Sequence, residues 1–138
     1  MAKQTGLGWT ALNIDDSASV AQDLMEDTTN FSFSTPRGVQ DVTSIDKSAR
    51  ERLLLLADLS ITLNGVFDDD TADSVHDVFA DVTDPTADAA RTTVITISGQ
   101  TLTATALYTD YALTRAQGGE FTFVVPGVNG DGTVPAWT

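Results

Sequence analysis

The stretch Arg91–Pro126 constrains the fold more than any other part of this 138-residue sequence. Apolar residues alternate with threonine in residues 91–98 and 101–114, and Phe121, Phe123 and Val125 alternate in a third run. β-Branched and aromatic residues at a period of two are typical of half-buried strands. Gly99-Gln100 and Gly118-Gly119 supply the two turns. The stretch therefore predicts a three-stranded antiparallel meander, residues 91–126, which other parts of the chain must cover.

The second strand of this meander changes phase along its length. Leu102, Ala104, Ala106 and Tyr108 share one parity, whereas Leu107, Tyr111 and Leu113 share the other. A slip of one residue turns side chains to the opposite face. We therefore expect a bulge, or a crossing between two sheets, at Tyr108–Leu113. Phe121, Phe123 and Val125 are expected to form the inward face of the third strand.

Four further strands and two helices are predicted outside the meander. The strands are Trp9–Ile14, Thr29–Thr35, Val39–Thr43 and Leu59–Gly65; a short helix capped by Asp46 covers Asp46–Leu53, and an amphipathic helix covers residues 71–83. The second helix is expected because one side of its helical wheel is apolar, formed by Ala72, Val75, Val78, Phe79 and Val82. The opposite side carries Asp73, Asp77 and Asp81. Asp84-Pro85 is expected to end this helix. The run Leu53–Leu56 is expected to be buried core or an interface.

A projecting hairpin is predicted over residues 27–46. Thr35-Pro36-Arg37-Gly38 fits a type I turn, which would pair the strand of Phe31 and Phe33 with Val39–Thr43. The sequence as a whole predicts one domain, residues 1–138, of the mainly β class. We expect an antiparallel β-sandwich or barrel of six to eight strands, with one flanking amphipathic helix and the projecting hairpin.

The composition offers few residues for catalysis or metal binding. The chain has no cysteine and one histidine, His76, so neither a histidine-based triad nor a thiolate metal site is expected. Asp68-Asp69-Asp70 and Asn129-Gly130-Asp131-Gly132 could each hold an ion, although a solvated helix cap and a plain turn explain them better. We expect no catalytic residues, no cofactor, no metal and no enzymatic activity. The sequence contains no apolar run of about 18 residues, so no membrane span is predicted.

The charge is strongly acidic. Twenty acids, seventeen of them aspartate, stand against seven bases and give a formal net charge of −13. A chain with so few cations is not expected to bind nucleic acid through its phosphates. Two explanations remain open: the acids form a wall that repels DNA, or they adapt the surface to a high-salt cell.

Three blocks of the sequence resemble the major tail (tail tube) proteins of long-tailed viruses of prokaryotes. They are DKSARERLLLLADLSITLNGVFD (Asp46–Asp68), HDVFADV (His76–Val82) and the segment Thr101–Trp137. The resemblance implies a β-sandwich with a flanking helix, six copies to a ring, and rings stacked into a tube through which DNA passes without specific binding. It also implies a location in the virion tail, assembly in the host cytoplasm, other tail proteins as partners and no membrane.

The projecting hairpin is the expected contact between subunits or rings. The expected interface residues are Phe31, Phe33, Pro36, Arg37, Gly38 and Val39. With acids spread over the whole sequence, we further expect a halophilic archaeal host. Two alternatives stay open: a tail-completion (connector) ring protein, and a calcium- or carbohydrate-binding β-sandwich module that would use Trp9 or Trp137.

Overall fold

The computed structural model describes residues 3–84 and 90–138 and has the predicted mainly β, antiparallel architecture. Its described part contains eleven strands, one α-helix and one 3-10 turn (Gly6–Gly8). The elements are β1 (Trp9–Asp15), β2 (Ala21–Asp23), β3 (Thr28–Ser34), β4 (Arg37–Asp41), β5 (Arg52–Ala57), β6 (Ser60–Val66), α1 (Val75–Phe79), β7 (Ala90–Ile97), β8 (Gln100–Tyr108), β9 (Ala112–Arg115), β10 (Phe121–Asn129) and β11 (Ala136–Trp137). The excess over the six to eight strands expected comes largely from the short strands β2, β9 and β11.

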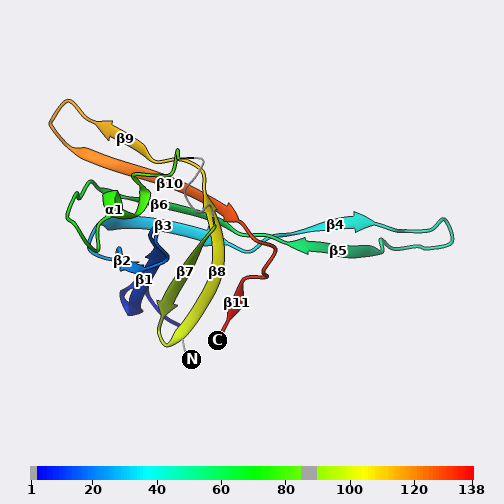
Figure 1. Ribbon diagram of the computed structural model, residues 1–138. Coiled ribbons are helices and arrows are strands. Elements are labelled where there is room, and N and C mark those ends of the chain that lie inside the picture. Colours follow the sequence, from blue (N-terminus) through cyan, green and yellow to red (C-terminus); the bar gives the residue numbers. More distant parts are fainter. Residues whose placement is uncertain (1–2, 85–89) are drawn as a thin grey trace.

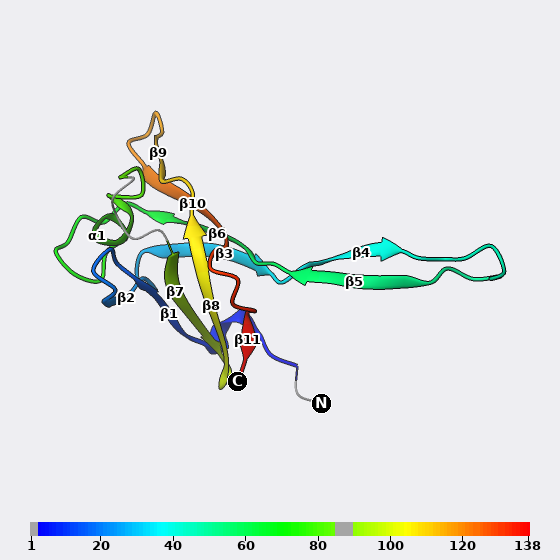
Figure 2. The ribbon, with the colours of Figure 1, turned by 45° about the vertical axis from the view of Figure 1, so that its right-hand side comes forward.

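One antiparallel sheet folds over on itself to make the body. Its strand order is β2-β1-β7-β8-β10-β6-β3, with β11 beside β8 and β9 beside β10. Strands β7 and β8 run steeply across the direction of β3, β6 and β10, so the two halves of the sheet face each other (Figures 1 and 2). The buried residues between them include Leu12, Ile14, Ile61, Leu63, Ile95, Phe123 and Val125.

The meander forms as predicted from β7, β8 and β10. Its first turn is Ser98-Gly99, because Gln100 already lies opposite Ile97. Ser98 and Gly99 have φ angles of 51° and 81°, the positive values that a two-residue hairpin loop of type I′ requires. The predicted position of this turn, Gly99-Gln100, was therefore wrong by one residue.

The predicted phase slip is present between β8 and β9. Tyr108 lies opposite Gly127 and Leu113 lies opposite Phe123, so the chain from β8 to β9 has one residue more than the facing part of β10. The side chains of Phe123 and Val125 are buried as predicted. Phe121 shares the inward face of β10 with Phe123 and Val125, as predicted, but it is 39% exposed because it lies at the end of the strand beyond the core.

The projecting hairpin exists, but its strands and its tip differ from the prediction. Strand β3 pairs with β6 and β4 pairs with β5. Ser34 lies opposite Ser60, Arg37 lies opposite Ala57, and between them the Asp58 N–H donates to the carbonyl of Pro36 at 2.9 Å. Residues 28–66 thus form one long hairpin, and the chain passes straight through Pro36 without turning.

We call the outer half of this hairpin, Arg37–Ala57, the arm. It projects from the body in both views, and its tip is formed by residues 42–51 (Figures 1 and 2). The helix predicted over Asp46–Leu53 is therefore absent: Arg52 and Leu53 belong to β5, opposite Asp41 and Gln40. Cross-strand pairing has overridden a helix propensity that is weak over so short a segment.

Helix α1 is shorter than the predicted residues 71–83. Asp73 has a φ of 52°, outside the helical region, and Ser74 is the N-cap, whose Oγ accepts the Asp77 N–H at 3.1 Å. The predicted apolar face is confirmed for Val75, Val78 and Phe79, which are buried, whereas Ala72 is exposed before the helix and Val82 is half-buried beyond it. Pro85, expected to end the helix, lies outside the described residues.

Candidate assembly surfaces

The arm exposes apolar side chains along most of its length. Val39 and the four residues Leu53–Leu56 are all solvent-exposed, Leu56 by 90%, and Ile45 at the tip is fully exposed. Successive residues of a strand point to opposite faces, so four leucines in a row make both faces of the ribbon apolar. A two-stranded ribbon of this kind is marginally stable in water by itself. The arm therefore has exposed apolar side chains on both of its faces.

Polar contacts give the arm a defined shape near its tip. Arg50 pairs with Asp41 at 2.5 Å, and the Glu51 N–H donates to Oγ1 of Thr43 at 2.7 Å. Hydrogen bonds from Thr43 and then from Arg50 hold the pKa of Asp41 below its usual value. Nearer the root, Nε of Arg37 donates to the Leu55 carbonyl at 2.8 Å. These contacts favour a preformed arm over a flexible loop.

Two edges of the sheet are also without a neighbour. Strands β3, β6, β10 and β9 lie side by side in that order, and among the described residues no strand pairs with the outer edge of β3 or of β9. Unpaired edges bring strands of other chains together. The body therefore presents an unpaired edge at each side of this four-stranded surface.

The outward face of these four strands carries no charge. The outward positions, which alternate with the buried ones, are Asn30, Ser32, Ser34, Ser60, Thr62, Asn64, Val66, Ala112, Thr114, Thr122, Val124, Pro126 and Val128. The acids of the described chain lie instead in the turns, at the ends of β1 and β2, around α1 and on the arm. This segregation was not expected from the sequence, in which the acids are scattered.

The acidic residues nearest the core play structural parts. Oδ2 of Asp27 accepts the Val75 N–H at 2.9 Å, at the start of α1, and its side chain also hydrogen-bonds Asp68. Burial, together with the neighbouring Asp68, raises the pKa of Asp27 to about 6. Asp81 pairs with the buried Arg91 at 2.8 Å. Burial acts to raise the pKa of Asp81, but hydrogen bonds from Ser17 and Arg91 lower it below its usual value.

The residues considered for chemistry are held in ordinary packing contacts. Nδ1 of His76 lies 3.4 Å from the Tyr111 hydroxyl, and its ring packs on Phe67 with centroids 5.3 Å apart. Asp131 accepts the Thr133 N–H at 2.9 Å in a turn. Within residues 3–84 and 90–138, no three His, Asp or Glu side chains are grouped so as to hold a metal ion. No helix in the described part of the chain is long and apolar enough to cross a membrane.

Comparison with known proteins finds matches to the fold of this chain but not to its sequence. No protein-family model and no curated protein matches the sequence. Among the solved chains that match in structure are one from the virion of a native gene transfer agent particle and one from the tail of an empty particle of that kind with C6 symmetry. In each case the TM-score is 0.75, the identity is 17%, and 99% of both chains is covered. The chain shares the fold of a gene transfer agent tail chain. Because both matching chains are covered nearly in full, the likeness includes the arm as well as the body.

The six predicted interface residues fall in three places. Phe31 and Phe33, in β3, are half-buried in a row of rings that runs Trp9–Phe31–Phe33–Trp137, with centroids 4.3, 5.8 and 6.0 Å apart. Pro36 lies at the root of the arm, and Arg37, Gly38 and Val39 belong to β4. The structure therefore brings three of the six onto the arm, and the two phenylalanines contact their own chain.

The most exposed apolar residues, Leu53–Leu56, were not among the six. The sequence did contain the signal, since the run of four leucines left buried core and interface as the alternatives. The structure excludes the core for all four.

Proposed function

We infer that this chain is the structural subunit of a virion tail, and that six copies form a ring and rings stack into the tail tube. The observation that carries this proposal is the match to a chain in a tail of C6 symmetry, over 99% of both chains. Its function is mechanical, and we propose no enzymatic activity and no cofactor.

The unpaired sheet edges support closure of the ring. The outer edge of β3 on one copy faces a direction opposite to the outer edge of β9, across the strands β6 and β10. Pairing of β3 with β9 of a neighbour is a head-to-tail contact, which closes into a ring when the rotation between copies fits. Six four-stranded surfaces joined in this way would make a barrel without edges.

The wall of that barrel would be uncharged rather than acidic. The body packs on the inner face of the four strands, so the outward face with its Thr, Ser, Asn and Val side chains would line the lumen. Such a wall offers no cations to DNA phosphates, so DNA would pass without adhering. We therefore revise the expected acidic conduit: the acids belong to loops and to the outer body.

The arm is the second contact in this proposal. Its two apolar faces would be covered by other subunits, and Arg37, Gly38 and Val39 would take part in that interface. We propose that the partners are further copies of this chain and, at the ends of the tube, other tail proteins. Assembly in the host cytoplasm and delivery of DNA by a long-tailed virus follow from the resemblance described above.

Electron microscopy of the purified protein tests this function. Hollow tubes of stacked rings are expected. Single rings that do not stack would favour a tail-completion protein. Dispersed monomers at every concentration and salt condition would contradict both and favour a binding module.

A further inference from the structure

The arm differs in charge from the rest of the chain. Residues 37–57 hold four of the seven bases, Arg37, Lys47, Arg50 and Arg52, and only three of the twenty acids. The formal charge of the arm is therefore +1, whereas the remaining residues carry −14. Arg50 is paired with Asp41 inside the arm, but Lys47 and Arg52 make no ion pair among the described residues. The arm thus offers an apolar surface flanked by free cations.

A second apolar surface, surrounded mainly by acids, lies at the opposite end of the molecule from the arm. Leu113 and Phe121, about 40% exposed, lie on one face of the β9–β10 hairpin. The ring of Phe121 packs on Phe67, with centroids 4.8 Å apart, and Phe67 leads directly into Asp68-Asp69-Asp70. We call these residues, 67–70 together with Leu113 and Phe121, the shelf.

The surroundings of the shelf are mainly acidic. Asp69 and Asp70 are exposed, as are Asp110 and Glu120 at the two ends of the hairpin, against one base, Arg115. Opposite charges around a shared apolar centre steer two surfaces together and fix their register.

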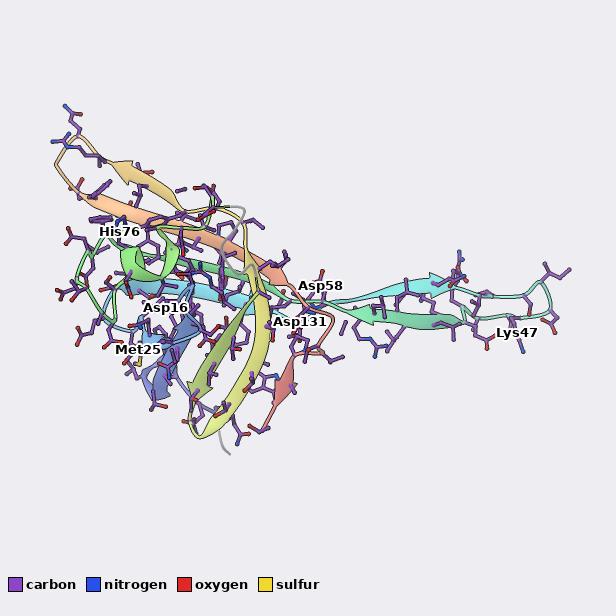
Figure 3. All side chains as sticks on the ribbon, in the orientation of Figure 1. Asp16, Met25, Lys47, Asp58, His76 and Asp131 are labelled. Atoms are coloured by element: carbon purple, nitrogen blue, oxygen red, sulfur yellow. The ribbon has the colours of Figure 1, made fainter. Side chains whose placement is uncertain are left out.

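The arm and the shelf of one molecule cannot meet each other. Lys47 marks the far end of the arm, and His76, which packs beside Phe67, lies at the opposite side of the body (Figure 3). Any contact between an arm and a shelf must therefore join two copies. Because the two surfaces differ, the contact is head-to-tail and can be repeated from copy to copy.

We propose that the arm of one subunit docks on the shelf of a second copy of this chain, with the leucines against Leu113 and Phe121 and with Lys47 and Arg52 near Asp69 and Asp70. This contact rests on the self-assembly proposed above and names the surface that receives the arm. We call this contact between the arm and the shelf the latch. It would join subunits in addition to the edge-to-edge contact of β3 with β9.

A charge-swap series tests the latch. One variant carries Lys47→Glu and Arg52→Glu, a second carries Asp69→Lys and Asp70→Lys, and a third combines all four changes, which restores the net charge of the wild type. All four positions are exposed, so the fold should tolerate the changes. We expect the concentration needed for assembly to rise by about tenfold or more in each two-site variant and to return toward the wild-type value in the combined variant.

A matched control separates the contact from general charge repulsion. Glu26→Lys with Asp131→Lys changes the net charge by the same amount as the two changes on the shelf, at exposed sites outside it. This control is expected to assemble at least as readily as the wild type, because it lowers the repulsion between copies and the hydrogen bond that it removes, from Thr133 to Asp131, lies in an exposed turn. A combined variant that assembles no better than the two-site variants would overturn the latch, even if wild-type tubes form. Absence of any wild-type assembly would instead overturn the proposed function. In that case, a photo-crosslinker at Leu54 would still report whether the arm contacts the shelf of a second copy.

Discussion

Asp27 is the carboxyl group at which three segments of the fold meet. Its side chain accepts the Val75 N–H and hydrogen-bonds Asp68, and its carbonyl accepts the Val66 N–H at 2.9 Å. A Cβ on Gly65 would lie 1.9 Å from that carbonyl oxygen, so only glycine fits opposite Asp27. The corner between β2 and β3, the end of β6 and the start of α1 are therefore fixed to one another through this residue.

The raised pKa of Asp27 predicts a loss of stability as the pH rises. The native state keeps a proton on this carboxyl up to about pH 6, whereas the unfolded chain releases it near 3.8. The free energy of unfolding that Asp27 contributes is therefore full below about pH 4 and is lost progressively as the pH rises through the folded-state pKa of about 6. Asp27→Asn, which keeps an acceptor for Val75 and removes the charge, should be more stable than the wild type above that pH.

Urea unfolding of both proteins between about pH 4 and about pH 8 measures this difference. Asp110→Asn is the control, because it removes an exposed carboxylate. Other carboxyls, such as Asp41 and Asp81, have lowered pKa values and lose stability toward acid, so the test is the difference between variant and wild type. A difference that stays constant over the whole range would show that Asp27 carries no extra proton.

The burial of Asp27 could not be predicted from the sequence. It is one of seventeen aspartates, and nothing in its neighbours distinguishes it. Only the fold buries it beside Asp68. By contrast, the inward positions of Ile95, Leu63 and Phe123 follow from alternation alone and were predictable.

The arm is the element on which the assembly proposal depends most. None of the buried core residues belongs to it, so the body should fold without it. Arg37 and Ala57 lie opposite each other, and an Asn-Gly pair between them would close the hairpin with a type I′ turn. Removal of residues 38–56 in this way should leave the melting temperature within a few degrees and abolish tubes.

Size-exclusion chromatography and electron microscopy of the armless variant check this expectation. A folded subunit that still makes tubes of normal length would contradict a role for the arm in assembly. A subunit that no longer folds would contradict the separation of arm and core.

Strands were easier to predict than their pairing. Periodicity located β1, β3, β6 and the meander, because one face of each is buried. The partner of β3 was misassigned, since Pro36 followed by Gly38 resembles a turn and the common register of residues 28–66 leaves no mark in the sequence. The extent of α1 was overestimated for a similar reason: a helical wheel cannot show that Asp73 is drawn out of the helix to accept the Asp23 N–H at 2.9 Å.

At the scale of the whole molecule, we propose that the acids suit a high-salt environment and do not form an acidic lumen. Asp73, Asp77 and Asp81 do not line one side of a helix as predicted, because only Asp77 lies in α1, and Asp81 has Arg91 as a partner. The acids nevertheless crowd the outer body, and the four strands proposed as the tube wall have none on their outward face. Six copies of net charge −13 would repel one another strongly in dilute buffer.

Assembly and melting temperature should therefore both rise with NaCl between about 0.1 M and about 3 M, as screening shortens the range of this repulsion. Light scattering and calorimetry measure the two quantities. A protein that assembles equally well and melts no lower in dilute buffer would contradict the halophilic host, while leaving the tube itself untouched.

A cryo-EM map of the assembled wild-type protein would show the proposed tube directly. We predict rings of six subunits stacked into a hollow tube, with β3 of each subunit paired to β9 of its neighbour and the uncharged face of β3, β6, β10 and β9 toward the lumen. Rings with a different number of subunits, or a solid filament in which these edges stay unpaired, would contradict it.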